Sequence, residues 1–377
     1  MLVALALCQG ALAAAPLPSS SVTARLQRAL DEAVAADRAV PGALASISAP
    51  AAGLEWSGAS GRIALHDAAR LVPDQPFRIA SITKVFVAAA AFRLCEERRL
   101  LLFGPLTPYL SAQTLSALRR GGYQPDRITI QQLLAHTSGI YDYASSPVYN
   151  ALIMASPHRR WTRAEQIRLA MERGRPVGRP GERFAYSDTG YVILGEIIER
   201  VTGKPLPQAV RSLLRLDSLA MTSTYFESRD TPAPNALPLA HQYLKDFDFA
   251  GVDPSFDLYG GGGLVSTTGD LTHFMRALLQ GRLFTLRQTL ASALMTVDAV
   301  HDPGDHLHAN LLTTYPFGRH MCWGHRGFWA SEALYCPDID VAMAVTLNQS
   351  EELDGPGLKR LIDALGREID RLPGLSP

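Results

Sequence analysis

The sequence predicts a mixed α/β fold, an antiparallel sheet of five or more strands flanked by N- and C-terminal helices, with a large inserted all-helical subdomain. Short strand-like runs occur near both ends of the 377-residue chain, beside amphipathic helical patterns, while the middle is mostly helical. Hydrophobic residues make up 47% of the chain, which provides a core for one large domain or two intimate ones.

The N-terminal part reads as a helix, two strands and a second helix. Residues 22–39 carry apolar side chains at helical spacing, and a Pro-Gly pair ends that pattern. Residues 43–49 and 54–63 then read as two strands around an Ala-Gly turn. The apolar run 81–95 predicts a buried helix that begins at Ser81.

The remaining elements fall into a helical middle and a strand-rich end. Long polar or Pro-rich loops, such as 228–240, separate the helices of the segment 105–250. Four glycines at 260–263 predict a sharp turn into residues 264–267. The other predicted helices cover 130–136, 163–173, 189–202, 207–215, 269–279 and 355–371, and the other predicted strands cover 317–324, 329–336 and 339–347.

Strands near both ends of the chain are expected to join in one sheet. We therefore expect a sheet subdomain built from residues 16–85 and 255–377, and a helical subdomain built from residues 86–254. A cleft between two such subdomains is a usual place for an active site.

The N-terminal segment predicts export. In residues 1–15 an apolar run is followed by small residues with A-x-A-like sites, as in a secretory signal, although the segment lacks a positive charge. A short apolar helix is the alternative. We therefore expect a periplasmic or secreted protein, and no later apolar stretch is long enough for a transmembrane segment in the mature chain.

Cysteine usage leaves one question open. Cys95 falls in the apolar helix and reads as a buried core thiol. Cys322 and Cys336 flank a predicted hairpin, so they could pair in an oxidising compartment or remain two buried thiols.

Charge and composition exclude several partners. The formal net charge is zero and no basic tract occurs, so nucleic acid is not an expected partner. The cluster His301–His308 looks like a metal site, but its Pro-Gly turn and polar setting fit a solvated loop better. We therefore expect no metal and no organic cofactor.

Lys84 is one of only four lysines in a chain with 32 arginines, and it stands three residues after Ser81. On a helix, positions i and i+3 share a face, so the two side chains are expected to meet. Arginine cannot lose its proton in a protein, whereas a desolvated lysine can and then acts as a base. The pair has the layout of a serine nucleophile and its activator, although chance can also supply this spacing.

Three other segments add to this pair. A loop ahead of a predicted helix places Tyr186 two residues before Asp188, and His325 lies in a His-Arg-Gly triplet between strands. Taken alone, Tyr186 reads as a loop-capping hydroxyl and His325 as a partly buried structural histidine. His136, in a third segment, is expected to end a helix and hydrogen-bond a loop.

With these segments in this order, the chain resembles the serine β-lactamase and penicillin-binding protein superfamily. It most resembles the branch of class C β-lactamases, D-alanyl-D-alanine carboxypeptidases and related esterases, over about residues 22 to 372, which implies a β-lactamase/transpeptidase-like fold. The matching segments are Ser81-Ile82-Thr83-Lys84, Tyr186-Ser187-Asp188, His325-Arg326-Gly327, the LLxHxSG stretch within Leu133–Tyr143 and the GGLxSTxxDL stretch within Gly261–Asp270.

The resemblance implies a role for each matched residue. Ser81 would attack an acyl carbonyl and form an acyl-enzyme, and Lys84 would hold or accept its proton. Tyr186 would relay protons, and His325 would orient that relay from the strand side. The backbone N–H groups of Ser81 and of Phe328, the residue after the triplet, would form the oxyanion hole.

Two positions depart from the relatives. Asp188 stands in place of an Asn, so it cannot donate a hydrogen bond to a substrate carbonyl, but it could pair with Lys84 and keep the amine charged. Arg326 stands where relatives often carry a small hydroxyl residue. It could bind a substrate carboxylate, form an ion pair with Asp188, or point to solvent.

The predicted function is that of a serine hydrolase that acts through an acyl-enzyme. Esters rank first as substrates, because they have a better leaving group and tolerate the loss of the Asn donor. A D-alanyl-D-alanine carboxypeptidase on peptidoglycan-type peptides or a D-amino-acid amidase ranks second, and a β-lactamase third. A catalytically weak binding protein with the same fold is the alternative from another class.

Overall fold

The computed structural model describes residues 19–375 except for residue 233 and the segments 298–305 and 351–355. The predicted signal at residues 1–15 and most of the histidine cluster, His301–Asp305, therefore lie outside the described residues. No described helix combines the length and the hydropathy that crossing a bilayer requires.

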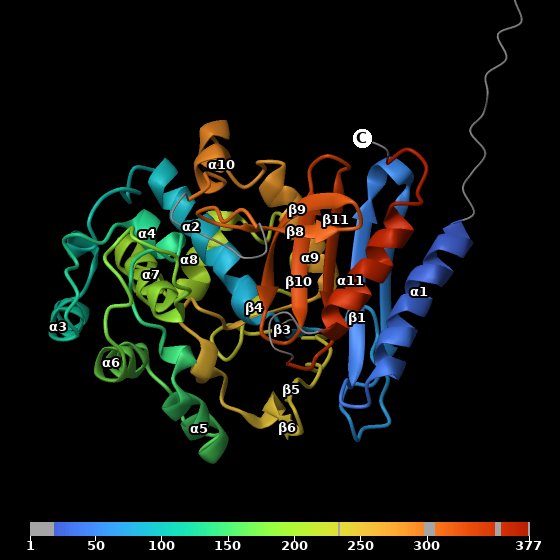
Figure 1. Ribbon diagram of the computed structural model, residues 1–377, viewed down its shortest axis with the longest axis horizontal. Coiled ribbons are helices and arrows are strands. Elements are labelled where there is room, and N and C mark those ends of the chain that lie inside the picture. The colour runs from blue at the N-terminus through green and yellow to red at the C-terminus, as the bar shows by residue number, and fades with distance from the viewer. Residues whose placement is uncertain (1–18, 233, 298–305, 351–355, 376–377) are drawn as a thin grey trace, which may run out of the picture.

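A six-stranded antiparallel sheet forms one half of the molecule, in the order β2-β1-β11-β10-β9-β8 (Figure 1). Strand β1 pairs with β11, with Leu44 opposite Thr346, so the two ends of the chain meet in one sheet. The predicted antiparallel sheet of five or more strands is confirmed. The strands are β1 (Gly42–Ala49), β2 (Leu54–Gly61), β8 (Thr313–Phe317), β9 (His320–Gly327), β10 (Ser331–Cys336) and β11 (Val341–Thr346).

The sheet has a helix layer on each face. The terminal helices α1 (Ser19–Ala36) and α11 (Pro356–Ile369) lie side by side on one face and bury their apolar stripes there (Figure 1). On the opposite face, α9 (Thr268–Leu279) packs against β1, β10 and β11. The central strands β10 and β11 are buried on both faces as a result.

Helices fill the other half of the molecule around α2 (Thr83–Glu96) (Figure 1). Every residue of α2 from Thr83 to Phe92 is buried, as its run of alanine, valine and phenylalanine predicts for a core helix. The surrounding helices are α3 (Ala112–Arg120), α4 (Ile130–Leu134), α5 (Pro147–Ala155), α6 (Arg163–Arg173), α7 (Asp188–Thr202), α8 (Leu206–Leu214) and α10 (Arg287–Ala293).

Short strands connect the two halves. The strand β7, which follows the predicted glycine turn, pairs with β3 just before Ser81 and with β4. A separate hairpin joins β5 to β6. Their bounds are β3 (Phe77–Arg78), β4 (Tyr225–Phe226), β5 (Tyr243–Leu244), β6 (Phe247–Asp248) and β7 (Leu264–Ser266).

The structure corrects one predicted strand and adds three helices. The predicted strand over 317–324 is displaced to β9, His320–Gly327, because Gly318, with φ of 59°, turns the chain ahead of it. The pair Phe317–His320 closes a two-residue hairpin loop, and β8 before it is an additional strand. Helices α3, α5 and α10 were not predicted, since each spans only seven to nine residues.

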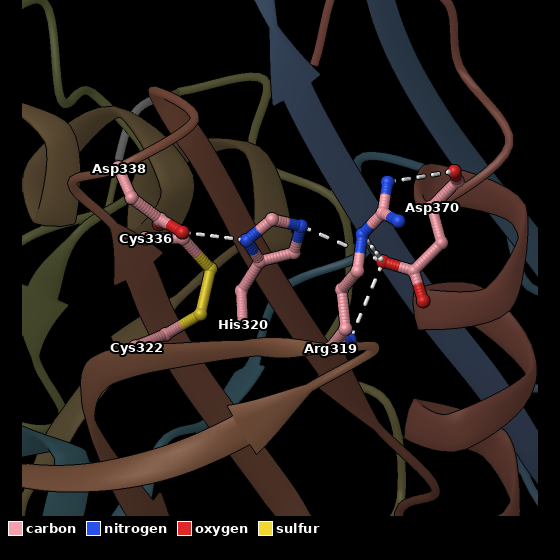
Figure 2. The surroundings of a disulfide bond; sticks show 6 residues. All are labelled: Arg319, His320, Cys322, Cys336, Asp338 and Asp370. Atoms are coloured by element: carbon pink, nitrogen blue, oxygen red, sulfur yellow. Dashed lines mark hydrogen bonds and ion pairs between the residues drawn. A yellow bond between two sulfur atoms is a disulfide. The ribbon is translucent and has the colours of Figure 1, made fainter. Parts of the chain in front are cut away.

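Cys322 of β9 and Cys336 of β10 form a disulfide bond rather than remaining two buried thiols (Figure 2). Beside it, the buried ring of His320 binds Asp338 through Nδ1, with 2.5 Å between Nδ1 and Oδ2, and Nε2 lies 3.5 Å from Asp370 Oδ1 (Figure 2). The β8–β9 hairpin is therefore tied both to β10 and to the end of α11. Cys95 is a free, half-buried thiol, and burial raises its pKa to about 12.

Candidate active site

Ser81 lies at a strained turn between β3 and α2. It is the middle residue of a short 3₁₀ turn, Ala80–Ile82, that leads into the helix. Ala80 has a positive φ of 45°, a left-handed conformation that costs free energy in a residue with a side chain. Such strain is typical of functional sites, and the first helical turn leaves backbone N–H groups near Ser81 without helical partners.

Lys84 lies directly over Ser81, as the i,i+3 spacing predicts. Its Nζ is 2.9 Å from Ser81 Oγ and 2.6 Å from the carbonyl oxygen of Gly261, and it forms an ion pair with Asp188. The side chain is fully buried. Burial lowers the pKa of Lys84, but attraction to the Asp188 carboxylate and to further acidic groups outweighs this and raises the pKa above its ordinary value. Lys84 is therefore an ammonium group.

Asp188 is the first residue of α7, where the helix dipole favours a carboxylate. The preceding Ser187 caps the helix by accepting a hydrogen bond from the Gly190 N–H at 3.2 Å. The Asp188 N–H donates to Asp142 Oδ1 at 3.1 Å. The helix start thus fixes the carboxylate against Lys84.

Tyr186 reaches the same place from the loop before α7. The Lys84 ammonium is 5.0 Å from the centre of the Tyr186 ring, and the ring stacks on His136 with centroids 4.3 Å apart. His136 Nδ1 accepts a hydrogen bond from the Ser187 N–H at 3.1 Å, so this helix-end histidine binds a loop, as expected. Burial raises the pKa of Tyr186 to about 12, although Lys84 opposes this. Tyr186 is therefore a neutral phenol.

The His-Arg-Gly triplet closes the site from β9. A Cβ atom at Gly327 would lie only 2.6 Å from the Ile79 carbonyl oxygen, so glycine lets β9 approach the turn that carries Ser81. His325 Nδ1 donates to the Arg326 carbonyl oxygen, 2.7 Å away, which leaves Nε2 as an acceptor. Burial and the nearby Lys84 lower the pKa of His325 to about 4, so the ring is neutral. Phe328 follows the triplet and is 43% exposed at the cavity rim.

Arg326 neither pairs with Asp188 nor points to solvent. Neighbouring strand residues point to opposite faces of a sheet, so Arg326 points away from the face of His325. Its Nε lies 2.7 Å from Oε2 of Glu332, the residue directly opposite on β10, and that carboxylate is completely buried. The guanidinium also lies over the ring of Tyr315 at 4.5 Å. The expected pair with Asp188 is wrong, because Lys84 holds that carboxylate.

Two further carboxyl groups lie near the Lys84–Asp188 pair, and neither was predicted as a site residue. Asp142 accepts the Asp188 N–H, and Asp257 lies against the backbone of Gly262. Burial, and then repulsion from Asp188, raises the pKa of each to about 7. Asp142 lies in the LLxHxSG-Tyr-Asp-Tyr stretch and could have been found there, whereas no sequence signal marks Asp257.

These groups surround one cavity of about 1020 Å³. Ser81, Tyr186, Asp188 and His325 all line it. The structure thus brings together the turn before α2, the start of α7 with its preceding loop, and β9. Within the described residues, no three His, Cys, Asp or Glu side chains gather as a metal site would require.

Comparisons with known proteins agree with this geometry. The chain is 32% identical over 222 residues to Protein Rv1367c of Mycobacterium tuberculosis, covering 55% of this chain and 54% of that protein. It is 33% identical over 204 residues to Esterase EstB of Burkholderia gladioli, covering 52% and 50%. The chain thus spans about half the length of the curated relatives it matches.

Similarity to solved structures extends further along the chain. The crystal structure of a D-stereospecific amidohydrolase from a Streptomyces species superposes with a TM-score of 0.76 at 29% identity, covering 91% of this chain and 98% of that one. The description of the matching family model is Beta-lactamase, and the match runs over residues 22–367. The chain therefore belongs to the Beta-lactamase family.

Proposed function

We propose that the protein is a serine hydrolase that cleaves small esters or amides through an acyl-enzyme on Ser81. The observation that carries this proposal is the 2.9 Å contact between Ser81 Oγ and the buried Lys84 ammonium, on the wall of a large cavity. Family membership and the similarity to an esterase and an amidohydrolase support it.

The charge state of the site defines how protons move in this proposal. Lys84 is already protonated, so it acts as a relay rather than as a free base. As Ser81 Oγ attacks the acyl carbon, Lys84 passes one proton to Asp188 and takes the Ser81 proton. Tyr186, a neutral phenol, gives its proton to the leaving oxygen or nitrogen, and Lys84 stabilises the phenolate that forms.

Hydrolysis of the acyl-enzyme is the second half of the reaction, and it restores the starting protonation state of each residue. The Tyr186 phenolate removes a proton from water, and the resulting hydroxide attacks the acyl carbon. Ser81 Oγ leaves and regains its proton through Lys84 from Asp188. The neutral ring of His325, with Nε2 free to accept, orients the hydroxyl groups of this relay. The N–H groups of Ser81 and Phe328 stabilise the oxyanion of both steps.

Esters are the first substrates under this proposal. Asp188 offers no N–H to a substrate amide carbonyl, and an ester provides a better leaving group. Amides are the second candidate, because a structure 29% identical over nearly its full length is that of a D-stereospecific amidohydrolase. β-Lactams rank below both, since the chain has Asp188 where lactam-cleaving relatives have an amide donor.

A covalent label tests the proposal. Purified protein is incubated with a fluorophosphonate and its intact mass is measured, beside the variant Ser81→Ala. We expect one adduct on the wild type and none on the variant, and p-nitrophenyl acetate is cleaved only by the wild type. A wild type that takes no adduct and cleaves no ester would overturn the proposal.

The same proposal extends to the place where the protein works. Disulfides form and persist in oxidising environments, so the bond between Cys322 and Cys336 supports a periplasmic or secreted protein. Fractionation of cells that express the natural sequence, followed by a non-reducing mass measurement, tests this. Recovery of the protein in the cytoplasm with two free thiols at these positions would contradict it.

A further inference from the structure

The cavity beside Ser81 is larger than a small acyl group requires. Its volume of about 1020 Å³ lies at the upper end of the range for ligand pockets. Aromatic side chains from several segments line the cavity, and aromatic linings favour apolar ligands. They are Tyr143, Tyr149, Phe249, Phe256, Phe328 and Trp329.

The lysine and arginine cations on the described wall are already paired. Arg326 is held by the buried Glu332 at 2.7 Å, and Lys359 is held by Asp363 at 3.0 Å. Recognition of a substrate carboxylate uses a cation that offers its N–H groups to both oxygens. A substrate carboxylate at Arg326 would have to share the guanidinium with the buried carboxylate of Glu332, which brings two like charges close together.

Acidic groups take the place of that cation near the nucleophile. Asp142 and Asp257 line the cavity together with Asp188, and Lys84 forms its ion pair with Asp188. A substrate carboxylate that entered this space would be repelled by these acidic groups, because like charges close together in a desolvated site cost several kcal/mol. The wall is therefore selective by charge as well as by size.

From these two features we infer that the site takes substrates whose acyl group is bulky, apolar and free of carboxylate. This inference rests on the proposed function and narrows its substrate class.

Matched p-nitrophenyl esters test the inference on the wild-type protein at pH 8. The neutral ester is the 6-methylheptanoate, and mono-p-nitrophenyl adipate replaces its isopropyl end with a carboxylate of similar size. We expect kcat/KM for the neutral ester to exceed that for the adipate by about tenfold or more. We also expect it to exceed that for the acetate. Equal or faster cleavage of the adipate or of the acetate overturns the inference.

A cationic ester and one variant refine the test. The 5-(trimethylammonio)pentanoate ester should be cleaved faster than the adipate, because its charge is opposite. Asp257→Asn should lower the neutral-to-adipate ratio by about threefold or more, since one repulsive carboxylate is gone. Asp340→Asn changes the net charge equally on the sheet, away from the cavity wall, and should keep the ratio. Equal ratios in both variants argue against the role of Asp257.

The outcomes also separate this inference from the proposed function. If no ester is cleaved and fluorophosphonate does not label Ser81, the hydrolase proposal itself fails. If every ester is cleaved with similar kcat/KM, the enzyme is a hydrolase without this selectivity. Should Asp257→Asn not fold, as judged by circular dichroism, the wild-type ratio alone still decides.

Discussion

The Lys84 ammonium and the Asp188 carboxylate form a buried ion pair, and the ammonium also contacts the hydroxyl of Ser81. An asparagine at position 188 would leave the lysine without its main attraction, and burial would then favour the neutral amine. Asp188 instead favours the charged form of Lys84. It makes the lysine a proton relay with a defined acceptor, and the first prediction follows from this difference.

Replacement of Asp188 by Asn should make Ser81 reactivity depend on deprotonation of Lys84. Burial lowers the pKa of Lys84, and the variant removes the carboxylate that opposes it. Labelling of Ser81 by fluorophosphonate should then rise with pH by up to about tenfold per unit below the new pKa. The wild type should lack this rise. We also expect faster cleavage of amides, since the amide side chain supplies a donor; superimposable pH profiles would refute the relay.

Loss of the Arg326 guanidinium should destabilise the fold strongly. Arg326→Leu leaves the buried Glu332 without its cation, which costs about 3 to 5 kcal/mol in comparable buried pairs. Urea unfolding measures this loss. The double variant Arg326→Leu, Glu332→Leu should recover most of it, because no buried charge remains. A single variant as stable as the wild type would show that the pair contributes little.

The same variant should show a defined pH dependence. Burial raises the pKa of Glu332 in the folded protein, while Arg326 lowers it, so removing Arg326 raises it further. A carboxyl group whose folded pKa lies above its unfolded pKa destabilises the fold at high pH, and the penalty fades as pH falls through the folded pKa. The stability difference between Arg326→Leu and wild type should therefore shrink towards acidic pH. A difference that grows there would contradict this sign.

Gly327→Ala should impair catalysis by displacing the turn that carries Ser81. The added Cβ would lie 2.6 Å from the Ile79 carbonyl oxygen and 2.4 Å from Ser331 Oγ, distances that require the backbone to move. We expect kcat for p-nitrophenyl acetate to fall by about tenfold or more, since small displacements at a reacting centre are costly. Gly251→Ala is the control, because its Cβ would meet no atom within 4 Å. Unchanged kcat in Gly327→Ala would contradict the close approach of β9.

Reduction of the bond between Cys322 and Cys336 should lower the free energy of unfolding. The two cysteines are 14 residues apart, and closing a loop of about 15 residues contributes about 3 kcal/mol by restricting the unfolded chain. The melting temperature of the wild type, measured with and without a reductant, checks this. The double serine variant should melt like the reduced wild type, and Cys95→Ser should respond to reductant as the wild type does.

The sequence predicted those parts of the site that depend on local spacing. Lys84 meets Ser81 because i,i+3 positions share a helix face, and His136 ends its helix where expected. The motif order placed Tyr186 and His325 at the same cavity. Local patterns also gave the bounds of several elements within one or two residues, such as α6 and β10.

Relations across the fold could not be predicted in this way. The partner of Arg326 is fixed by strand register, which puts Glu332 opposite it. That register is set by the turn at residues 328–330, which joins β9 to β10. Asp257 lies in a short turn without a recognisable pattern, and its nearness to Lys84 arises only from the folded chain. Tertiary contacts therefore determine the charge balance that governs selectivity.

The pairing of β1 with β11 also bears on how the protein is made. Leu44 can pair with Thr346 only after β11 has left the ribosome, so the middle of the sheet stays open while the intervening helices are synthesised. Contacts between such distant segments form slowly. Until β11 pairs with it, one edge of β1 stays open, and other chains can pair with an open edge. Completion of the sheet thus has to wait for a strand that is synthesised about 300 residues after β1.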